Sequence, residues 1–379
     1  MIRGQRALRI LVVAPSRYPL RQPHAGGLEA CVWDRVRWLR ARGHEVTLCA
    51  ADGSDFLDDA VPEFHLPTPE WVRPEFASDT DYPSGYAGAV DAAFDAARDR
   101  LIADRHLYDV VDNHSLHPAP IRWSRDADIP VVTTLHTPPL EPLLEAAGEV
   151  GDGSHRFVAV SQATARAWSV EGVDAFVFPN GIDTDQWTRG AGGRSWVWSG
   201  RIVPEKAPHL AIEAARTADA HIVLAGRIGD VDYFEQEVVP RLGAHARYVG
   251  PLRQPDLCRL VGSSAVALVT PMWEEPFGLV IAEALATGTP VAAFDIGGVS
   301  EVLAGMPGSA TVTPGDVVAL AHAAAELAAA GEREPLTRVW TRRAAVRQHS
   351  LAQRYREVER VLAYTAQPVA ARRVPAVSW

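Results

Sequence analysis

Short apolar runs alternate with longer amphipathic stretches along most of the chain. Such runs are typical of strands buried on both faces of a parallel sheet, and the amphipathic stretches are typical of the helices that connect them. The pattern predicts strands at residues 8–14, 45–50, 109–112, 130–135, 157–160, 175–178, 196–199, 221–226, 247–250, 265–270, 291–294 and 310–312. The main predicted helices lie at 28–39, 88–103, 162–168, 207–216, 233–242, 256–261, 279–286, 316–330 and, with a break near 350, 338–364. This alternation indicates an α/β fold with doubly wound sheets.

The alternation is interrupted once, near the middle of the chain. Residues 179–183 have the composition of a turn, and residues 184–194 are rich in glycine and poor in apolar side chains. A chain of 379 residues is long enough for two domains. We therefore predict an N-terminal domain at 1–184, a C-terminal domain at 195–350, and a last helix with its tail at 351–379.

One region departs from the pattern. Residues 51–86 contain scattered acidic, proline and aromatic residues without clear periodicity. They could form an ordered surface excursion or a mobile flap over a binding cleft.

Composition narrows the class of protein. No apolar run is long enough to span a membrane. A net charge of -10 argues against a nucleic-acid partner, although a few local cations suffice to hold a phosphate. The three cysteines are far apart and lack the spacing of metal ligands. This favours a cytoplasmic location and argues against zinc and disulfides.

The strongest chemical signal lies between residues 265 and 294. A predicted strand, a loop, an apolar helix and a second strand follow one another there as a βαβ unit. The first N–H groups of a helix lack intrahelical partners, so the start of this helix is a potential anion site. Glu275 in the loop could simply be solvated, and Glu283 in the helix could make a structural hydrogen bond. Because a carboxylate in so apolar a helix needs partners, the two could instead hold hydroxyl groups of one ligand.

Two cations occupy another junction between a strand and a helix. Arg201 and Lys206 lie between the predicted strand at 196–199 and the helix at 207–216. Loop cations are ordinarily solvated. At this junction they can instead converge on one diphosphate, which arginine can grip with two hydrogen bonds.

Paired glycines, Gly26 and Gly27, follow the first strand. They could form an ordinary flexible loop, or a loop whose backbone approaches a ligand closely because there is no Cβ. The G-x-G-x-x-G pattern of dinucleotide-binding proteins is absent after this strand.

Polar side chains follow two strands of the first half. His136 comes after the strand at 130–135, and Asn113 and His114 come after the strand at 109–112. Ligands of open α/β sheets bind at the carboxyl ends of the strands. We therefore expect a functional role for His136. For Asn113 and His114, a role beside an acceptor and a purely structural role both remain open.

Together these segments closely resemble the signature of the retaining family 4 glycosyltransferases of GT-B fold. The resemblance covers nearly the whole chain and rests on L-H-T at 135–137, N-G-I-D at 180–183, G-R-x4-K at 200–206, E-P-F-G-L-V-I-A-E-A at 275–284, G-T-P-V at 288–291 and the glycine pair at 297–298. It implies two Rossmann-like domains that face one another across a cleft, with the last helix crossing back to the first domain.

The resemblance also implies roles for individual residues. The catalytic residues would be His136, Arg201, Lys206 and Glu275. The donor-binding residues would be Gly26, Gly27, Arg201, Lys206, Leu252, Glu275, Phe277, Gly278, Leu279, Val280 and Glu283. In this scheme Glu283 accepts hydrogen bonds from the ribose, and His136 lies under the transferred sugar. Glu275 would accept hydrogen bonds from sugar hydroxyls, or act as the nucleophile of a double displacement. In the family, retention is usually attributed to front-face attack instead.

The activity implied is sugar-nucleotide-dependent, retaining transfer of a hexosyl-type sugar to a hydroxyl-bearing acceptor, for which we expect a small soluble molecule or natural product. No metal or other cofactor is expected, because the cationic clamp would stabilise the leaving diphosphate. Two alternatives are a sugar-nucleotide epimerase of GT-B fold and a non-catalytic sugar-nucleotide-binding protein. The sequence does not select the base, the sugar, the acceptor or the oligomeric state.

Overall fold

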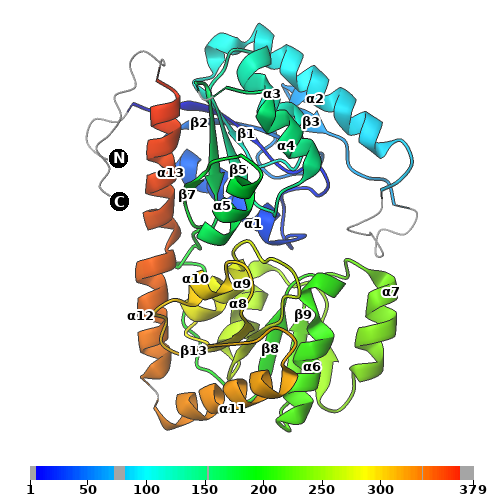
Figure 1. The fold of residues 1–379 in the computed structure, drawn as a ribbon, viewed down its shortest axis with the longest axis vertical. Coiled ribbons are helices and arrows are strands. Elements are labelled where there is room, and N and C mark those ends of the chain that lie inside the picture. Colours follow the sequence, from blue (N-terminus) through cyan, green and yellow to red (C-terminus); the bar gives the residue numbers. More distant parts are fainter. Residues whose placement is uncertain (1–5, 72–81, 152, 335, 368–379) are drawn as a thin grey trace.

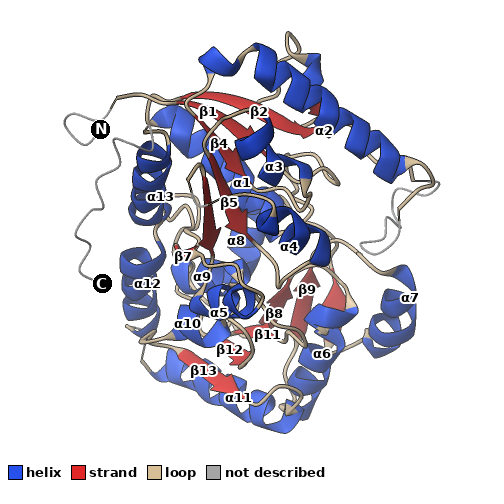
Figure 2. Cartoon of the chain, turned by 45° about the horizontal axis from the view of Figure 1, so that its top comes forward, coloured by secondary structure: helices blue, strands red, loops and turns tan. Residues whose placement is uncertain are grey.

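Two parallel sheets, one in each half of the chain, form the framework of the protein. The computed structural model describes residues 6–71, 82–151, 153–334 and 336–367. Figure 1 shows the two halves one above the other, and Figure 2 shows the strands of each half enclosed by helices. This arrangement confirms the predicted α/β architecture of two doubly wound, Rossmann-like domains.

The N-terminal domain is built on a parallel sheet with the order β3-β2-β1-β4-β5-β6-β7 among the described residues. The strands are β1 (Arg9–Val13), β2 (Glu45–Ala51), β3 (His65–Leu66), β4 (Val110–Asn113), β5 (Val131–Leu135), β6 (His155–Ala159) and β7 (Phe176–Val177). The helices are α1 (Gly27–Ala41), α2 (Tyr86–Ala103), α3 (Ala119–Asp126), α4 (Glu141–Gly148) and α5 (Gln162–Val170). Ser161 caps α5 as its side chain accepts a hydrogen bond from Thr164 N–H.

Apolar side chains fill both faces of this sheet. On one face, Val32 and Val36 of α1 pack with strand residues, and on the other face Phe94 of α2 and Trp123 of α3 do so. Because helices cover both faces, the strands have continuous apolar runs instead of alternating polar and apolar positions.

The C-terminal domain repeats this plan with the strand order β10-β9-β8-β11-β12-β13 in its described part. The strands are β8 (Trp196–Ser199), β9 (Ile222–Ala225), β10 (Ala246–Tyr248), β11 (Ala267–Val269), β12 (Val291–Phe294) and β13 (Ser309–Val312). The helices are α6 (Pro208–Thr217), α7 (Val231–Tyr233), α8 (Gln254–Gly262), α9 (Leu279–Ala286), α10 (Val299–Leu303), α11 (Val317–Arg333) and α12 (Thr337–His349).

The last helix, α13 (Leu351–Thr365), runs along the side of the N-terminal domain, where Figure 1 shows it in red. The helical path breaks at Ser350, whose backbone is extended, and α12 before the break packs on α9 of the C-terminal domain. Val358 and Leu362 of α13 then enter the core beside α1. Ile182 is paired through its backbone with His349 and Leu351, so the two crossings between the domains lie side by side.

Three segments differ from the expectations. Residues 65–66 form β3 at the edge of the first sheet, which the weak pattern of 51–86 did not predict, and residues 72–81 lie outside the described part. The predicted linker packs on the C-terminal domain through buried Trp187. The helix expected at 233–242 is instead the end of α7, a π-helical turn and a 3-10 turn, since Pro240 has no N–H to donate.

None of the helices in the described residues has the length and apolar content needed to cross a membrane.

Candidate active site

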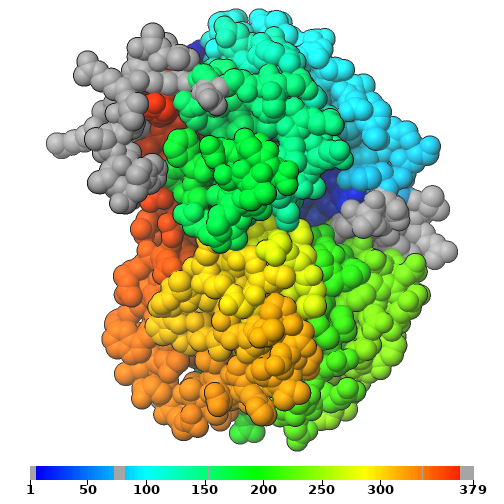
Figure 3. Space-filling view, in the orientation of Figure 1, coloured from blue at the N-terminus to red at the C-terminus, as the bar shows by residue number. Residues whose placement is uncertain are grey.

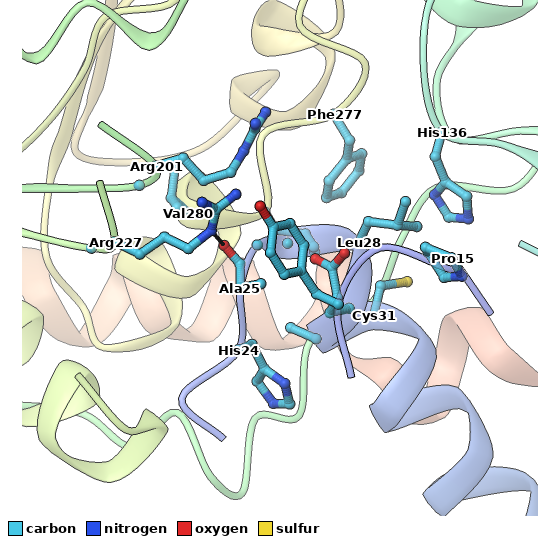
Figure 4. Close-up of a pocket in the computed structure, with 18 of the residues that line it drawn as sticks. Pro15, His24, Ala25, Leu28, Cys31, His136, Arg201, Arg227, Phe277 and Val280 are labelled. Atoms are coloured by element: carbon cyan, nitrogen blue, oxygen red, sulfur yellow. Dashed lines mark hydrogen bonds between the residues drawn. The ribbon is translucent and has the colours of Figure 1, made fainter. Parts of the chain in front are cut away.

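A cavity of about 640 Å³ lies between the domains, and the carboxyl ends of strands from both sheets contribute to its lining. In the first sheet β1 lies between β2 and β4, and in the second β8 lies between β9 and β11. These are the points at which each strand order reverses, where open α/β sheets bind ligands. Figure 3 shows the outer face along which the two domains meet, and Figure 4 shows part of the cavity.

The cavity gathers residues that are distant in the sequence. Its lining includes all the residues expected to bind the donor and His136, namely Gly26, Gly27, His136, Arg201, Lys206, Leu252, Glu275, Phe277, Gly278, Leu279, Val280 and Glu283. Figure 4 shows Arg201 on one side of the cavity and His136 on the other. The volume is in the range of sites that hold small ligands and cofactors.

Lys206 and Glu275 form an ion pair in the C-terminal wall. The same carboxylate oxygen of Glu275 accepts a hydrogen bond of 3.1 Å from the indole N–H of Trp273, and the Lys206 ammonium lies 4.9 Å from the centre of the Trp273 ring. These contacts fix both charged groups at the cavity surface. Lys206 is also the only lysine in the sequence; the other residues with a permanent positive charge are arginines.

Glycines hold the loop that carries Glu275. Gly278, the residue before α9, has a φ of 78°, a left-handed conformation that glycine adopts without strain. Gly297 and Gly298 lie against the backbone of the same loop, where Gly298 N–H donates to the Glu275 carbonyl at 2.7 Å. A Cβ at Gly297 would lie 2.4 Å from that carbonyl oxygen, so only glycine fits there.

Arg201 approaches the loop between β1 and α1 from the opposite domain. It follows β8, and its guanidinium lies 3.4 Å from the carboxylate of Glu205. A Cβ at Gly26 would be 3.5 Å from Arg201 Cδ, and one at Gly27 would be 3.2 Å from Leu279 Cδ1. The distance at Gly26 is an ordinary van der Waals contact, whereas the tight distance at Gly27 shows that this glycine lets the first domain pack closely on Leu279 of the second.

Glu283 is half-buried beside a second acid. Burial, reinforced by the Asp34 carboxylate on α1, raises its pKa to about 8. Burial also raises the pKa of Asp34, to about 6, although Arg37 opposes this shift. Both residues line the cavity, so two carboxyl groups from different domains face the same space.

The three polar residues expected at the strand ends of the first domain differ in their exposure to the cavity. His136 lines the cavity, whereas Asn113 and His114 are fully buried, with 0% exposure. Asn113 is held by Thr133 and Ser115, and His114 lies against His136. Their burial does not support direct contact with an acceptor, because neither side chain reaches the cavity surface.

Arg227 and Tyr18 are among the cavity residues that the sequence analysis did not single out. Arg227 follows β9, and its guanidinium donates to the Ala25 carbonyl at 2.9 Å and lies 4.4 Å from the centre of the Tyr18 ring. It thus joins the two domains at the cavity rim (Figure 4). Its place just after a parallel strand was the available signal, but Tyr18 stands in a loop without a recognisable pattern.

No group of three or more His, Cys, Asp or Glu side chains in the described residues is placed to hold a metal ion. Arg201, Lys206 and Arg227 line the cavity and could meet a phosphate there, as could N–H groups at the start of α9. The site can therefore bind an anion on the C-terminal wall and hydroxyl groups on the carboxylates.

Two family models match the chain. The model described as Glycosyltransferase Family 4 matches residues 25–186, and the model described as Glycosyl transferases group 1 matches residues 193–330. The first match contains the glycine pair and His136, and the second contains the residues from Arg201 to Glu283. With this fold and this cleft, the chain belongs to the family 4 glycosyltransferases of GT-B fold.

Curated relatives and solved structures agree with this assignment. The chain is 27% identical over 343 residues to a phosphatidyl-myo-inositol mannosyltransferase of Mycobacterium leprae, covering 83% of this chain and 86% of the relative. It is 29% identical over 337 residues to a D-inositol 3-phosphate glycosyltransferase of Mycobacterium avium, covering 76% and 78%. The structure of HepE from Anabaena in complex with UDP and glucose shares the fold, with a TM-score of 0.71, 20% identity and coverage of 94% and 99%.

Proposed function

We propose that the protein transfers a hexose from a nucleoside-diphosphate sugar to a hydroxyl group of a small soluble acceptor, with retention of the anomeric configuration. The observation that carries this proposal is the composition of one cavity. Arg201, Lys206 and the start of α9 line its C-terminal wall, and His136 lines its N-terminal wall. A diphosphate on the first wall would direct the attached sugar toward the second.

The leaving diphosphate needs opposing positive charge. When the bond between the anomeric carbon and the phosphate oxygen breaks, negative charge develops on the diphosphate. Arg201, Lys206 and the N–H groups near Gly278 would oppose that charge. The loss of one such contact is expected to cost about 2.7–4 kcal/mol of transition-state stabilisation. We propose metal independence on the same ground, and activity that persists in a chelator would support it.

Glu275 would orient the sugar. Its carboxylate already accepts from Lys206 and Trp273 and retains further lone pairs for sugar hydroxyls. The alternative role, nucleophile of a double displacement, requires a carboxylate. Glu275→Gln separates them, because the amide can still accept a hydrogen bond but cannot form the glycosyl ester. Retention of most activity would exclude the nucleophile.

The acceptor is proposed from chemistry and from the names of the relatives. The M. avium relative is described as acting on D-inositol 3-phosphate, and the M. leprae relative on phosphatidyl-myo-inositol. A polyol or its phosphate is therefore the first acceptor to test. Such a molecule offers the hydroxyl group that the reaction needs.

The test begins with thermal-shift measurements on the whole chain against nucleoside diphosphates and sugar nucleotides of each base. A donor at 100 times its Kd should stabilise the folded protein by about 2.7 kcal/mol. Arg201→Ala should abolish the shift, while Arg216→Ala at the end of α6 serves as a control outside the cavity. No shift with any of these compounds would contradict the proposal.

Product analysis with the donor so identified completes the test. Transfer to a polyol with the same anomeric configuration as the donor is expected. Formation of an epimeric sugar nucleotide without an acceptor would instead assign the protein as an epimerase. Tight binding without turnover on any polyol, sugar or natural-product acceptor would favour the non-catalytic alternative.

A further inference from the structure

We propose that Asp112 and His114 set the tautomer of His136, so that His136 presents an unprotonated Nδ1 to the cavity as a hydrogen-bond acceptor. In this proposal Asp112 and His114 are positioning residues that never touch the substrate. The proposal deepens the function proposed above and rests on it only in taking a ligand hydroxyl as the donor to His136.

The three side chains form a continuous chain of contacts. Asp112 lies in β4, His114 follows β4, and His136 follows the neighbouring strand β5. Oδ1 of Asp112 is 3.2 Å from Nε2 of His114. Nδ1 of His114 is 2.8 Å from Nε2 of His136. Neither atom of the first contact makes a hydrogen bond within the described residues, so Asp112 and His114 interact there as a close polar contact instead of a regular hydrogen bond.

A buried arginine fixes the charge at the inner end of the chain. Arg35 of α1 is 3% exposed, and its guanidinium lies 3.4 Å from the other oxygen of Asp112. Burial raises the pKa of Asp112, but the Arg35 guanidinium and the adjacent His114 ring lower it by more, to about 2. Asp112 is therefore a carboxylate, which can accept a hydrogen bond but cannot donate one.

The proton positions follow from this charge. The carboxylate favours the proton of His114 on Nε2. Burial lowers the pKa of His114 in spite of Asp112, so the ring is neutral and Nδ1 carries a lone pair. That lone pair can only accept from Nε2–H of His136. Burial, His114 and Arg35 hold the pKa of His136 well below its usual value, so His136 is neutral as well, and its Nδ1 carries no proton.

Nδ1 is the nitrogen left for a ligand. His136 lines the cavity, and within the described part of the chain its Nδ1 has no protein hydrogen-bond partner. The lone pair on this nitrogen would orient a hydroxyl group by accepting a hydrogen bond from it. A lowered pKa makes the same nitrogen a weak base, because a general base works best with a pKa near the working pH. His136 would therefore align a hydroxyl group without removing its proton.

The direct test is the protonation pattern of His136, read by long-range proton–nitrogen NMR of the whole protein labelled with 15N-histidine. Nε2 should show the signal of a protonated ring nitrogen and Nδ1 that of an unprotonated one. Assignment comes from the loss of signals in His136→Gln. The measurement needs no substrate, so it stands even if the proposed donor is wrong. A protonated Nδ1 in the unaltered protein would overturn the proposal.

Variants of His114 add a kinetic test that a merely structural role would not satisfy. In His114→Asn the amide oxygen can accept near the position of Nδ1, whereas His114→Leu cannot accept at all. With the donor identified above, kcat should fall about 10- to 100-fold in His114→Leu, by analogy with the loss seen when the partner that orients a metal-binding histidine is removed. The donor KM should be unchanged, and His114→Asn should recover most of the loss.

The control is His155→Leu. His155 is also buried, at 3% exposure, and lies in the same sheet, where its Nε2 contacts Thr133 at 3.0 Å. It should alter stability but neither the tautomer of His136 nor kcat at a temperature where the protein is folded. Equal kcat for the asparagine and leucine variants of His114 would count against the proposal. An equal loss of kcat in the His155 variant would do the same.

Discussion

The ammonium group of Lys206 is ion-paired with the carboxylate of Glu275, although the two residues lie 69 positions apart in the sequence. Each comes from a loop that follows a strand of the C-terminal sheet, and Trp273 contacts both. The pair sits at the surface where we propose that the diphosphate and the sugar bind. Lys206 is thus held by the acid that, in the proposed function, would orient the sugar beside the bond to be broken.

Replacement of Lys206 tests whether this ammonium is needed. Lys206→Ala should lower kcat about 10²- to 10³-fold, because it removes a charged donor from the leaving diphosphate. Lys206→Arg should recover little, since the planar guanidinium is larger and cannot take the place of a compact ammonium between Glu275 and Trp273. Steady-state kinetics measure both variants. Near-normal kcat in Lys206→Ala would contradict the assignment.

The single lysine also permits a chemical test without mutation. Acylation with an amine-reactive ester should modify only Lys206 and the N-terminal amine. A saturating nucleoside diphosphate should protect Lys206, and the N-terminal amine in the same sample is the internal control. Mass spectrometry of the digested protein measures both sites. Equal labelling of Lys206 with and without the ligand would argue against contact with the diphosphate.

Gly297 tests whether the loop that carries Glu275 must be held in place. Gly297 has a φ of 64°, and a Cβ there would lie 2.5 Å from Glu275 N. Gly297→Ala should therefore displace the loop and lower both donor affinity and kcat. Gly88→Ala is the control, because a Cβ at that helical position meets nothing within 4 Å. We expect the Gly88 variant to keep full activity, and similar kinetics for the two variants would refute the requirement.

A carboxylate of one domain caps a helix of the other. Glu301 of α10 accepts hydrogen bonds of 2.7 Å from Gln162 N–H and Ala163 N–H at the start of α5. Charge-assisted bonds at a helix N-terminus contribute about 1.5–3 kcal/mol, so Glu301→Ala should favour an open arrangement of the domains. Small-angle scattering should show a larger radius of gyration, and the donor KM should rise. Exposed Glu326 of α11, replaced by alanine, should change neither.

The raised pKa of Glu283 predicts a pH-dependent stability. Its pKa is about 8 in the folded protein and 4.5 ordinarily, so between these values the folded state binds more protons than the unfolded state. Stability should therefore be highest at low pH in this window and fall as pH rises through 8. Asp34, the second acid with a raised pKa, is ionised above pH 6 in both the folded and the unfolded state, so it adds little to the pH dependence of stability there.

Melting temperatures of the protein and of Glu283→Gln, measured from pH 6 to pH 9, isolate this contribution. The variant should lose less stability over the range, because the amide does not titrate. Glu326→Gln, on the exposed face of α11, should follow the unaltered protein. Parallel curves for all three proteins would show that Glu283 does not have the expected pKa.

Much of the site could be predicted because its chemistry is local in the sequence. The G-R-x4-K segment and the E-P-F-G-L-V-I-A-E-A segment each join a strand to a helix, so the strand direction alone fixes which edge of the sheet their charges occupy. The residues that escaped prediction lack such a local pattern. Arg227 contacts Ala25, 202 positions away, and the short edge strand β3 depends on pairing with β2 and not on its own two residues.

By itself the sequence determined the α/β alternation, the division into two domains and the place of Arg201 and Lys206 at one wall of the cavity, because periodicity and short motifs are properties of neighbouring residues. Only the tertiary structure decided which polar side chains reach the cavity. Asn113, His114 and His136 all lie at or just after the end of a strand, yet Asn113 and His114 are fully buried beside Thr133, Ser115 and Asp112, whereas His136 lines the cavity. Burial is set by contacts between distant segments, and a strand-end pattern does not contain them.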